Sequence, residues 1–394
     1  MTIAPDFHRM LGGLSFCTIL VGFSVPAIAQ VIPDDTLGGE RSIVTRETIR
    51  GVDSDRIDGG SRQGRNLFHS FQQFDVQEGR GAYFSNPADV RNIFSRVTGV
   101  DRSEIMGRLG VLGDANLFFM NPNGIVFGPN SSLDVNGSFV GTTANAIQFG
   151  EQGFFSATNP EVPSELLTID PSAFLFNQIG IGSIENSSRA PGRDPSDSFD
   201  TFGLQVEDGH SLLLLGGNLT FDQGGLVAFD GRIDLGAVAG TGTVGLNING
   251  DALSLSFPDD LPRSDVTLTN GAGFLVTNTG TGSIVITAQN ISVFEGSALG
   301  AGILSGQTSN GALPGNIILD AIGTITIADG SYAFNEIYSD AVGSSGDVVI
   351  DAAQLTVRDG GQVGILNSGE GTAGNLVVRA SGSIELNGGA SDSL

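Results

Sequence analysis

The side chains that could carry out covalent or acid–base chemistry are few and widely separated in this sequence. The only cysteine, Cys17, lies in an apolar leader, and the two histidines beyond the leader are His69 and His210. His69 stands between Phe68 and Phe71, without a serine and an aspartate that would complete a catalytic triad with it. The sequence therefore predicts no thiol nucleophile, no disulfide, no cysteine-bound zinc and no histidine-centred triad.

Carboxylates recur in register within the repeated strands, where Asp320 and Asp351 occupy equivalent positions. They are either solvated side chains of an alternating strand or a pair that serves calcium binding or acid–base chemistry. Basic partners are scarce, because the chain has no lysine and Arg358 and Arg379 stand alone in the repeats. Calcium-repeat, phosphate-loop and dinucleotide motifs are also missing. We favour the solvated interpretation and predict a protein that is not an enzyme, with no catalytic residue, no metal and no cofactor.

The most informative local pattern is the turn Asn121-Pro122-Asn123-Gly124, which lies between two apolar segments. Leu117 to Met120 precede it and Ile125 to Phe127 follow it directly. Asparagine, proline and glycine mark turns because they fix φ or tolerate positive φ. The segment is therefore predicted to be strand, tight turn and strand.

Four copies of one pattern fill the C-terminal part of the chain, and they begin at Gly282, Gly315, Gly346 and Gly374, which are 33, 31 and 28 residues apart. Apolar side chains occupy the second, fourth and sixth places after each glycine. They are Ile284, Ile286 and Ala288; Ile317, Leu319 and Ala321; Val348, Ile350 and Ala352; and Leu376, Val378 and Ala380. This period of two is typical of a strand with one buried face.

Each copy continues with a second short apolar pair and a turn that contains glycine, and the first three copies add a third apolar stretch, around Ile303, Ile337 and Ile365. Three strands per repeat in the same register describe one coil of a parallel β-helix. A propeller would need longer blades of antiparallel hairpins. We therefore predict an all-β, right-handed, single-stranded parallel β-helix with an N-terminal β cap and short extra-helical hairpins.

The remaining segments are less regular. Residues 202–257 also contain short apolar strands separated by turns with glycine, but at less regular spacing, and they are interpreted as further coils. Residues 186–200 are polar and contain two prolines, so they are expected to form an exposed excursion. At most one short helix is expected, at residues 86–96, with Asn86 as N-cap and Pro87 at the first helical position.

The ends and the charge indicate export. A start with His8 and Arg9, an apolar run over residues 11–25 and the small residues Ala27 and Ala29 predict a cleavable signal peptide over residues 1–29. A membrane anchor is disfavoured because the run is short and is followed by Pro26. The formal net charge of −25 argues against nucleic acid and anionic lipid as partners.

Several motifs together resemble the N-terminal two-partner secretion (haemagglutination activity) domain of filamentous-haemagglutinin-type exoproteins, especially cyanobacterial ones. They are the Asn121-Pro122-Asn123-Gly124 turn, residues 66–76, residues 92–99 and residues 134–146. The family's second signature, Asn-Pro-Asn-Leu, has no counterpart in this chain.

The resemblance implies a route and a set of partners. The Sec machinery and signal peptidase would act first, and a dedicated outer-membrane barrel transporter of a Gram-negative envelope would then recognise the N-terminal domain. The chain would be secreted through the periplasm and outer membrane to the cell surface or medium. Asn121, Pro122, Asn123 and Gly124 would serve either the folding of this domain or direct contact with the transporter, and the folding role is favoured.

We therefore expect a signal peptide at 1–29, a two-partner secretion domain at 30–280 with its motif core at 31–150, and β-helix repeats at 281–394 that end in mid-coil. The expected function is adhesive or structural at the cell surface, with a host, cell-surface or polysaccharide ligand. The alternative is a carbohydrate-active β-helix, which a groove lined by several carboxylates and an arginine would indicate. An uncapped last coil is expected in a truncated or split exoprotein, or in a subunit that stacks end to end on a partner.

Overall fold

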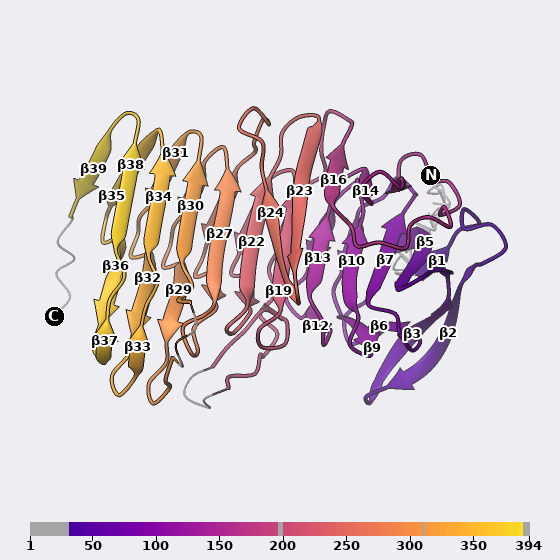
Figure 1. Ribbon diagram of the computed structural model, residues 1–394, viewed down its shortest axis with the longest axis horizontal. Helices are drawn as coiled ribbons and strands as arrows, with labels where there is room; N and C mark the ends of the chain where they lie inside the picture. Colours follow the sequence, from indigo (N-terminus) through magenta and orange to yellow (C-terminus); the bar gives the residue numbers. More distant parts are fainter. Residues whose placement is uncertain (1–30, 196–199, 310, 312, 389–394) are drawn as a thin grey trace, which may run out of the picture.

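The protein is a right-handed parallel β-helix with an extra layer on one face (Figure 1). The computed structural model describes residues 31–195, 200–309, 311 and 313–388. The predicted signal peptide, with Ala27 and Ala29, lies outside the described residues. Among the described residues every regular element is a strand, in agreement with the predicted all-β class.

Three faces run along the helix, and the chain visits them in the order first, second, third in each complete coil. The first face is one sheet of β1 Val31–Pro33, β4 Ser61–Gln63, β5 Asn66–Phe74, β7 Asn92–Val97, β10 Asn116–Met120, β13 Phe139–Thr142, β19 Ser211–Gly216, β22 Arg232–Ala237, β27 Ser283–Ala288, β30 Ile317–Ala321, β34 Val348–Ala352 and β38 Leu376–Ala380. The second face is one sheet of β8 Ser103–Ile105, β11 Ile125–Phe127, β17 Ile184–Asn186, β20 Leu219–Asp222, β25 Val266–Thr269, β28 Ile291–Val293, β31 Thr324–Ile327, β35 Gln354–Arg358 and β39 Ile384–Asn387.

The third face is divided into two sheets. The N-terminal sheet contains β2 Ser42–Ile49, β3 Val52–Gly59, β6 Gly81–Ser85, β9 Arg108–Leu112 and β12 Ser132–Asp134. The C-terminal sheet contains β18 Leu204–Gln205, β21 Gly225–Val227, β26 Gly273–Leu275, β29 Ala298–Ile303, β32 Tyr332–Ile337 and β36 Gln362–Asn367. Two short strands, β33 Val342–Ser344 and β37 Glu370–Thr372, pair beside it.

The predicted repeats stack in the predicted register. Ile284 lies opposite Ile317, Ile317 opposite Val348, and Val348 opposite Leu376 along the first face. Because equivalent side chains stack, one aliphatic core runs through the inside of the coils.

An extra-helical sheet covers the outside of the first face in the N-terminal half (Figure 1). It consists of β14 Ala146–Gln148, β15 Phe154–Ser156, β16 Ala173–Phe176, β23 Gly242–Asn249 and β24 Ala252–Ser256, all paired antiparallel. Outward-facing Phe68, Phe94 and Phe118 are fully buried in a second core beneath this sheet. The predicted extra-helical hairpins are thus present, and residues 242–256 form one of them instead of a coil.

The N-terminal cap is built from antiparallel strands. The strands β1 and β4 both pair with β5, and β2 forms a hairpin with β3. Phe71, Phe74 and Phe84 pack edge to face or stacked at this end of the core.

The expected helix at residues 86–96 was wrong, because Asn92–Val97 is the strand β7 between β5 and β10. The Asn86 side-chain amide donates to the carbonyl oxygens of Pro87 and Val90. Asp89 has a positive φ of 65°, which interrupts any helix. Pairing with two neighbouring strands therefore outweighs the local N-cap signal.

The last described strands are β38 and β39. Here Leu376, Ile384 and Leu386 are 47%, 51% and 72% exposed. The described part of the chain contains no helix that is long and apolar enough to span a membrane.

Candidate functional site

The Asn121-Pro122-Asn123-Gly124 turn is the corner at which one coil passes from the first face to the second, between β10 and β11. The corresponding corner of the preceding coil is residues 98–102, and the next coil brings Gly182 and Ser183 against the turn. The predicted strand–turn–strand is therefore confirmed.

Asn121 is fully buried, and its side chain uses all of its hydrogen-bonding capacity inside the protein. Its Nδ2 donates to the carbonyl oxygen of Asp101 at 3.1 Å and to Oγ of Ser103 at 3.0 Å. Its Oδ1 accepts from the backbone N–H of Asn123 at 3.0 Å and from Asn123 Nδ2 at 3.1 Å. An amide with two donors and two acceptor lone pairs is saturated by these contacts.

The other residues of the turn differ in exposure. Gly124 is buried with a φ of +124°, and a Cβ on neighbouring Gly182 would lie 2.5 Å from its nitrogen. Pro122 is half-buried and Asn123 is exposed, although Asn123 Nδ2 donates to the carbonyl oxygen of Gly99 at 2.8 Å. Pro122 and Asn123 are thus the two residues of the turn that a partner could touch.

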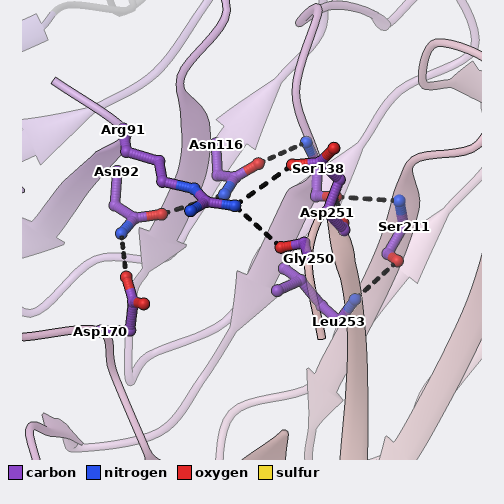
Figure 2. A network of polar contacts seen from close by, with 9 residues as sticks. All are labelled: Arg91, Asn92, Asn116, Ser138, Asp170, Ser211, Gly250, Asp251 and Leu253. Carbon is purple, nitrogen blue, oxygen red and sulfur yellow. Dashed lines mark hydrogen bonds and ion pairs between the residues drawn. The ribbon is translucent and has the colours of Figure 1, made fainter. Parts of the chain in front are cut away.

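A ladder of polar side chains lies at the N-terminal ends of the first-face strands, whereas the Asn121 turn lies at the C-terminal end of β10. Asn92 Nδ2 donates to Asn66 Oδ1 at 3.1 Å, and Asn116 Nδ2 donates to Asn92 Oδ1 at 3.0 Å. Asn116 Oδ1 then accepts from the backbone N–H of Ser138, and Ser138 Oγ accepts from that of Ser211 (Figure 2). Each coil thus supplies one rung.

The ladder also holds the extra-helical layer against the coils. Figure 2 shows Ser211 Oγ accepting from the backbone N–H of Leu253 at 3.0 Å, and Arg91 reaching the carbonyl oxygen of Gly250 at 2.9 Å. At the other end, Asn66 Nδ2 donates to the carbonyl oxygens of Leu167 and Ile169. Segments that are distant in sequence are joined through these side chains.

A second buried network joins the N-terminus to the same layer. Arg96 is 0% exposed, and its guanidinium donates to Ser70 Oγ, Thr36 Oγ1 and the carbonyl oxygens of Ser156 and Glu161 at 2.8–3.0 Å. Burial lowers the pKa of Arg96 to about 10.

Asp34 completes this network on the cap. Burial alone would raise the pKa of the Asp34 carboxyl group, but hydrogen bonds from Thr36, Thr98 and Ser70 outweigh burial and lower it. We call Asp34, Thr36, Ser70, Arg96 and Thr98 the cap network. Because the network contains the charged forms of both Asp34 and Arg96, it depends on their joint presence.

His69 is fully buried, and its Nδ1 lies 3.0 Å from Oγ of Ser42, which the sequence did not indicate. Burial lowers the pKa of His69 to about 3, although the negative charge of Asp58 acts in the opposite direction. No substrate can reach a serine–histidine pair with 4% and 0% exposure. His210 lies elsewhere, next to the carbonyl oxygen of Asp208.

Asp320 and Asp351 are adjacent in register, but each has an arginine partner. Arg263 lies 3.0 Å from Asp320 and Arg379 lies 3.0 Å from Asp351, so Arg379 does not stand alone as expected. A hollow of about 690 Å³ beside them contains both carboxylates and Arg379. Arginine stays charged in proteins, so Arg379 cannot serve as a base there. Among the described residues no three side chains of histidine, cysteine, aspartate or glutamate gather where they could hold a metal.

The ladder and the cap network were missed as sites by sequence reasoning. A signal for the ladder exists, because Asn-Leu-Phe, Asn-Ile-Phe and Asn-Leu-Phe begin at Asn66, Asn92 and Asn116. The strand register places these three asparagines side by side. The partners of Arg96 are hydroxyl and carbonyl groups up to 65 residues away, and no sequence pattern marks them.

These features define a class of protein, namely a capped parallel β-helix with an extra-helical sheet and an Asn-Pro-Asn-Gly corner. A sequence profile described as the TPS secretion domain matches residues 29–286, and the chain belongs to this family. Membership makes the protein an exported exoprotein of the two-partner kind, and the family is a secretion domain family instead of an enzyme family. None of the curated proteins matches the chain.

The chain is also similar to solved structures of secretion domains. The HMW1 secretion domain from Haemophilus influenzae is 15% identical, with a TM-score of 0.52 over 88% of this chain and 97% of that one. A filamentous hemagglutinin secretion domain is 16% identical, with a TM-score of 0.33 over 91% of this chain and 99% of that one. The HMW1 likeness supports the β-helix fold.

Proposed function

We propose that this chain is the exported partner of an outer-membrane barrel transporter and serves adhesion or surface structure outside the cell. Residues 1–29 would direct it through the Sec machinery and be removed by signal peptidase after Ala29. Residues 30–280 would act as the secretion domain, and residues 281–394 as β-helix repeats.

The observation that carries this proposal is the family match over residues 29–286, which spans the cap, the corner and the extra-helical sheet. The rest of the architecture suits passage as an extended chain. Beyond Cys17 the chain has no cysteine, so no disulfide can form in transit. Each coil pairs with its neighbours, so coils can add one after another as the chain emerges.

Within this function we assign a folding role to Asn121 and Gly124. Asn121 is saturated and buried, and Gly124 has a backbone conformation that favours glycine. Exposed Asn123 and half-buried Pro122 are the two positions where a transporter contact would be made.

The test is secretion in a two-plasmid system. The full chain with its signal peptide is expressed with and without the transporter encoded beside it, and the protein in the medium is measured by immunoblot. We expect release that requires the transporter, with the unreleased chain retained in the periplasm. A β-lactamase fusion reports periplasmic entry as the control, and equal release without the transporter would refute the proposed route.

A further inference from the structure

A groove of about 550 Å³ lies on the outside of the third face, over β26, β29 and β32. Every second residue of these strands faces outward. The register places the outward-facing Gly273, Ala298 and Tyr332 in one row across the three strands. Leu275, Gly300 and Phe334 form the next row. The groove exists because β29 presents only small side chains outward, whereas β26 presents Leu275 and β32 presents Tyr332 and Phe334.

The walls of the groove are aromatic. On one side, Phe202 is 38% exposed and its ring lies 3.9 Å from where a Cβ on Gly273 would be. On the other side, the rings of Tyr332 and Phe334 stack with centroids 5.2 Å apart and an interplanar angle of 23°. Adjacent strands are about 4.8 Å apart, so the two coil steps from β26 to β32 span roughly 10 Å. That width admits a flat ring between aromatic walls.

One end of the groove is polar. Glu336 and Tyr338 line it and are hydrogen-bonded to each other, and Tyr338 is 38% exposed. Burial and, to a smaller extent, the nearby Glu336 raise the pKa of Tyr338 to about 12. Among the described residues that line the groove there is no arginine and no histidine. With a formal net charge of −25 for the whole chain, the groove repels anions.

The backbone of the groove floor cannot bind an added strand. Each of the strands β26, β29 and β32 is paired with a neighbouring strand along both of its edges, so no free edge faces the groove. A ligand must therefore be recognised by aromatic faces and by hydroxyl and carboxylate groups. Saccharides offer apolar ring faces for stacking and hydroxyl groups for hydrogen bonds, and neutral ones meet no charge repulsion.

We propose that this groove binds a neutral hexose-based saccharide, with Tyr332 and Phe202 against the sugar rings and with the Glu336 carboxylate and the Tyr338 oxygen accepting hydrogen bonds from sugar hydroxyl groups. This inference rests on the adhesive half of the proposed function and is independent of the transporter. It is tested on purified protein, so its failure would leave the secretion result unchanged.

The experiment is titration calorimetry of the mature chain with neutral hexasaccharides of β-1,4-, β-1,3- and α-1,4-linked glucose. We expect at least one to bind, and oligogalacturonate, an anionic saccharide, not to bind. Tyr332→Ala removes an exposed ring, and Ala298→Leu fills the floor from an outward position; each should weaken binding about tenfold.

Phe154→Ala is the matched control, because Phe154 is 53% exposed but lies on the extra-helical sheet. It should leave the affinity unchanged, and circular dichroism should show the same thermal unfolding for all variants. Absence of binding to all three glucans, stronger binding of oligogalacturonate or of a proline-rich decapeptide, or glucan binding that neither groove variant weakens would overturn the proposal.

Discussion

Asn121 joins three successive coils through one residue. Its side chain bonds to Asp101 and Ser103 of the preceding coil, and its backbone N–H donates to the carbonyl oxygen of Thr142 in the following one. Buried polar groups that lose their partners are costly, whereas exposed ones regain water. The same residue type two positions later, Asn123, is exposed and serves as an internal comparison.

Replacement of Asn121 by alanine should lower the free energy of unfolding by about 2–4 kcal/mol, since the carbonyl oxygen of Asp101 and the N–H of Asn123 lose a buried partner. Asn123→Ala should cost about 1 kcal/mol or less. Urea unfolding of the purified mature chain measures both values. Secretion is measured in parallel. Normal stability with lost secretion in Asn123→Ala would indicate a transporter contact at Asn123, whereas normal stability in Asn121→Ala would contradict the folding role.

The burial of His69 predicts a pH dependence. Its folded pKa of about 3 lies below the ordinary value of 6.5 because of burial. Between these pH values the unfolded chain binds a proton that the native chain does not, so the free energy of unfolding should fall by ~1.4 kcal/mol per pH unit as pH decreases. His69→Gln should remove this part of the slope between pH 6.5 and pH 4.5. Equal slopes in the wild type and His69→Gln, measured by urea unfolding, would contradict the assignment.

At the scale of elements, side-chain networks decide how the cap and the extra-helical sheet attach to the coils. The ladder of Asn66, Asn92, Asn116, Ser138 and Ser211 runs along one edge of the first face and holds the β23–β24 hairpin. The cap network holds the N-terminus and the loop after β15. These networks bury polar groups together, which is stable only when every member is satisfied.

Arg96→Met keeps much of the side-chain volume but removes four of the donors that the cap network uses. We expect a loss of about 3–5 kcal/mol in the free energy of unfolding. The hydroxyl oxygens of Ser70 and Thr36 and two carbonyl oxygens lose a buried donor, and the Asp34 carboxylate loses a nearby positive charge. Exposed Arg102→Met is the control and should change stability by less than about 1 kcal/mol. Hydrogen exchange followed by mass spectrometry should show faster exchange in residues 31–37 and 154–161 in Arg96→Met; unchanged exchange there would mean that the cap is held by other contacts.

The whole molecule is a one-dimensional stack in which each coil contacts its neighbours. Stability in such stacks is close to a sum over coils and interfaces. The N-terminal and C-terminal halves differ, however. Up to β22 the first face is buried on its inner side by the coil core and on its outer side by the extra-helical sheet, whereas from β27 onward only its inner side is buried.

Truncation should therefore have unequal effects at the two ends. A chain that stops at Ser345, without β34 to β39, should still fold cooperatively with a smaller unfolding free energy. A chain that lacks residues 31–60 should lose its cooperative transition, since it exposes Phe71, Phe74 and Phe84 and removes Asp34 and Thr36 from the cap network. Differential scanning calorimetry distinguishes the two, and a cooperative transition without residues 31–60 would refute the dependence on the cap.

The amino-acid sequence by itself determined the coils of the C-terminal repeats, the turn at Asn121 and the family, because alternation of apolar side chains and the turn chemistry of asparagine, proline and glycine act over a few residues. Only the tertiary structure decided that residues 86–96 hold a strand, that Ser42 meets His69, and that Arg263 meets Asp320 across 57 residues of sequence. It likewise brings Asn66 to Leu167 across 101 residues. Contacts between such distant segments depend on how many coils and hairpins lie between them, and no local pattern encodes that number.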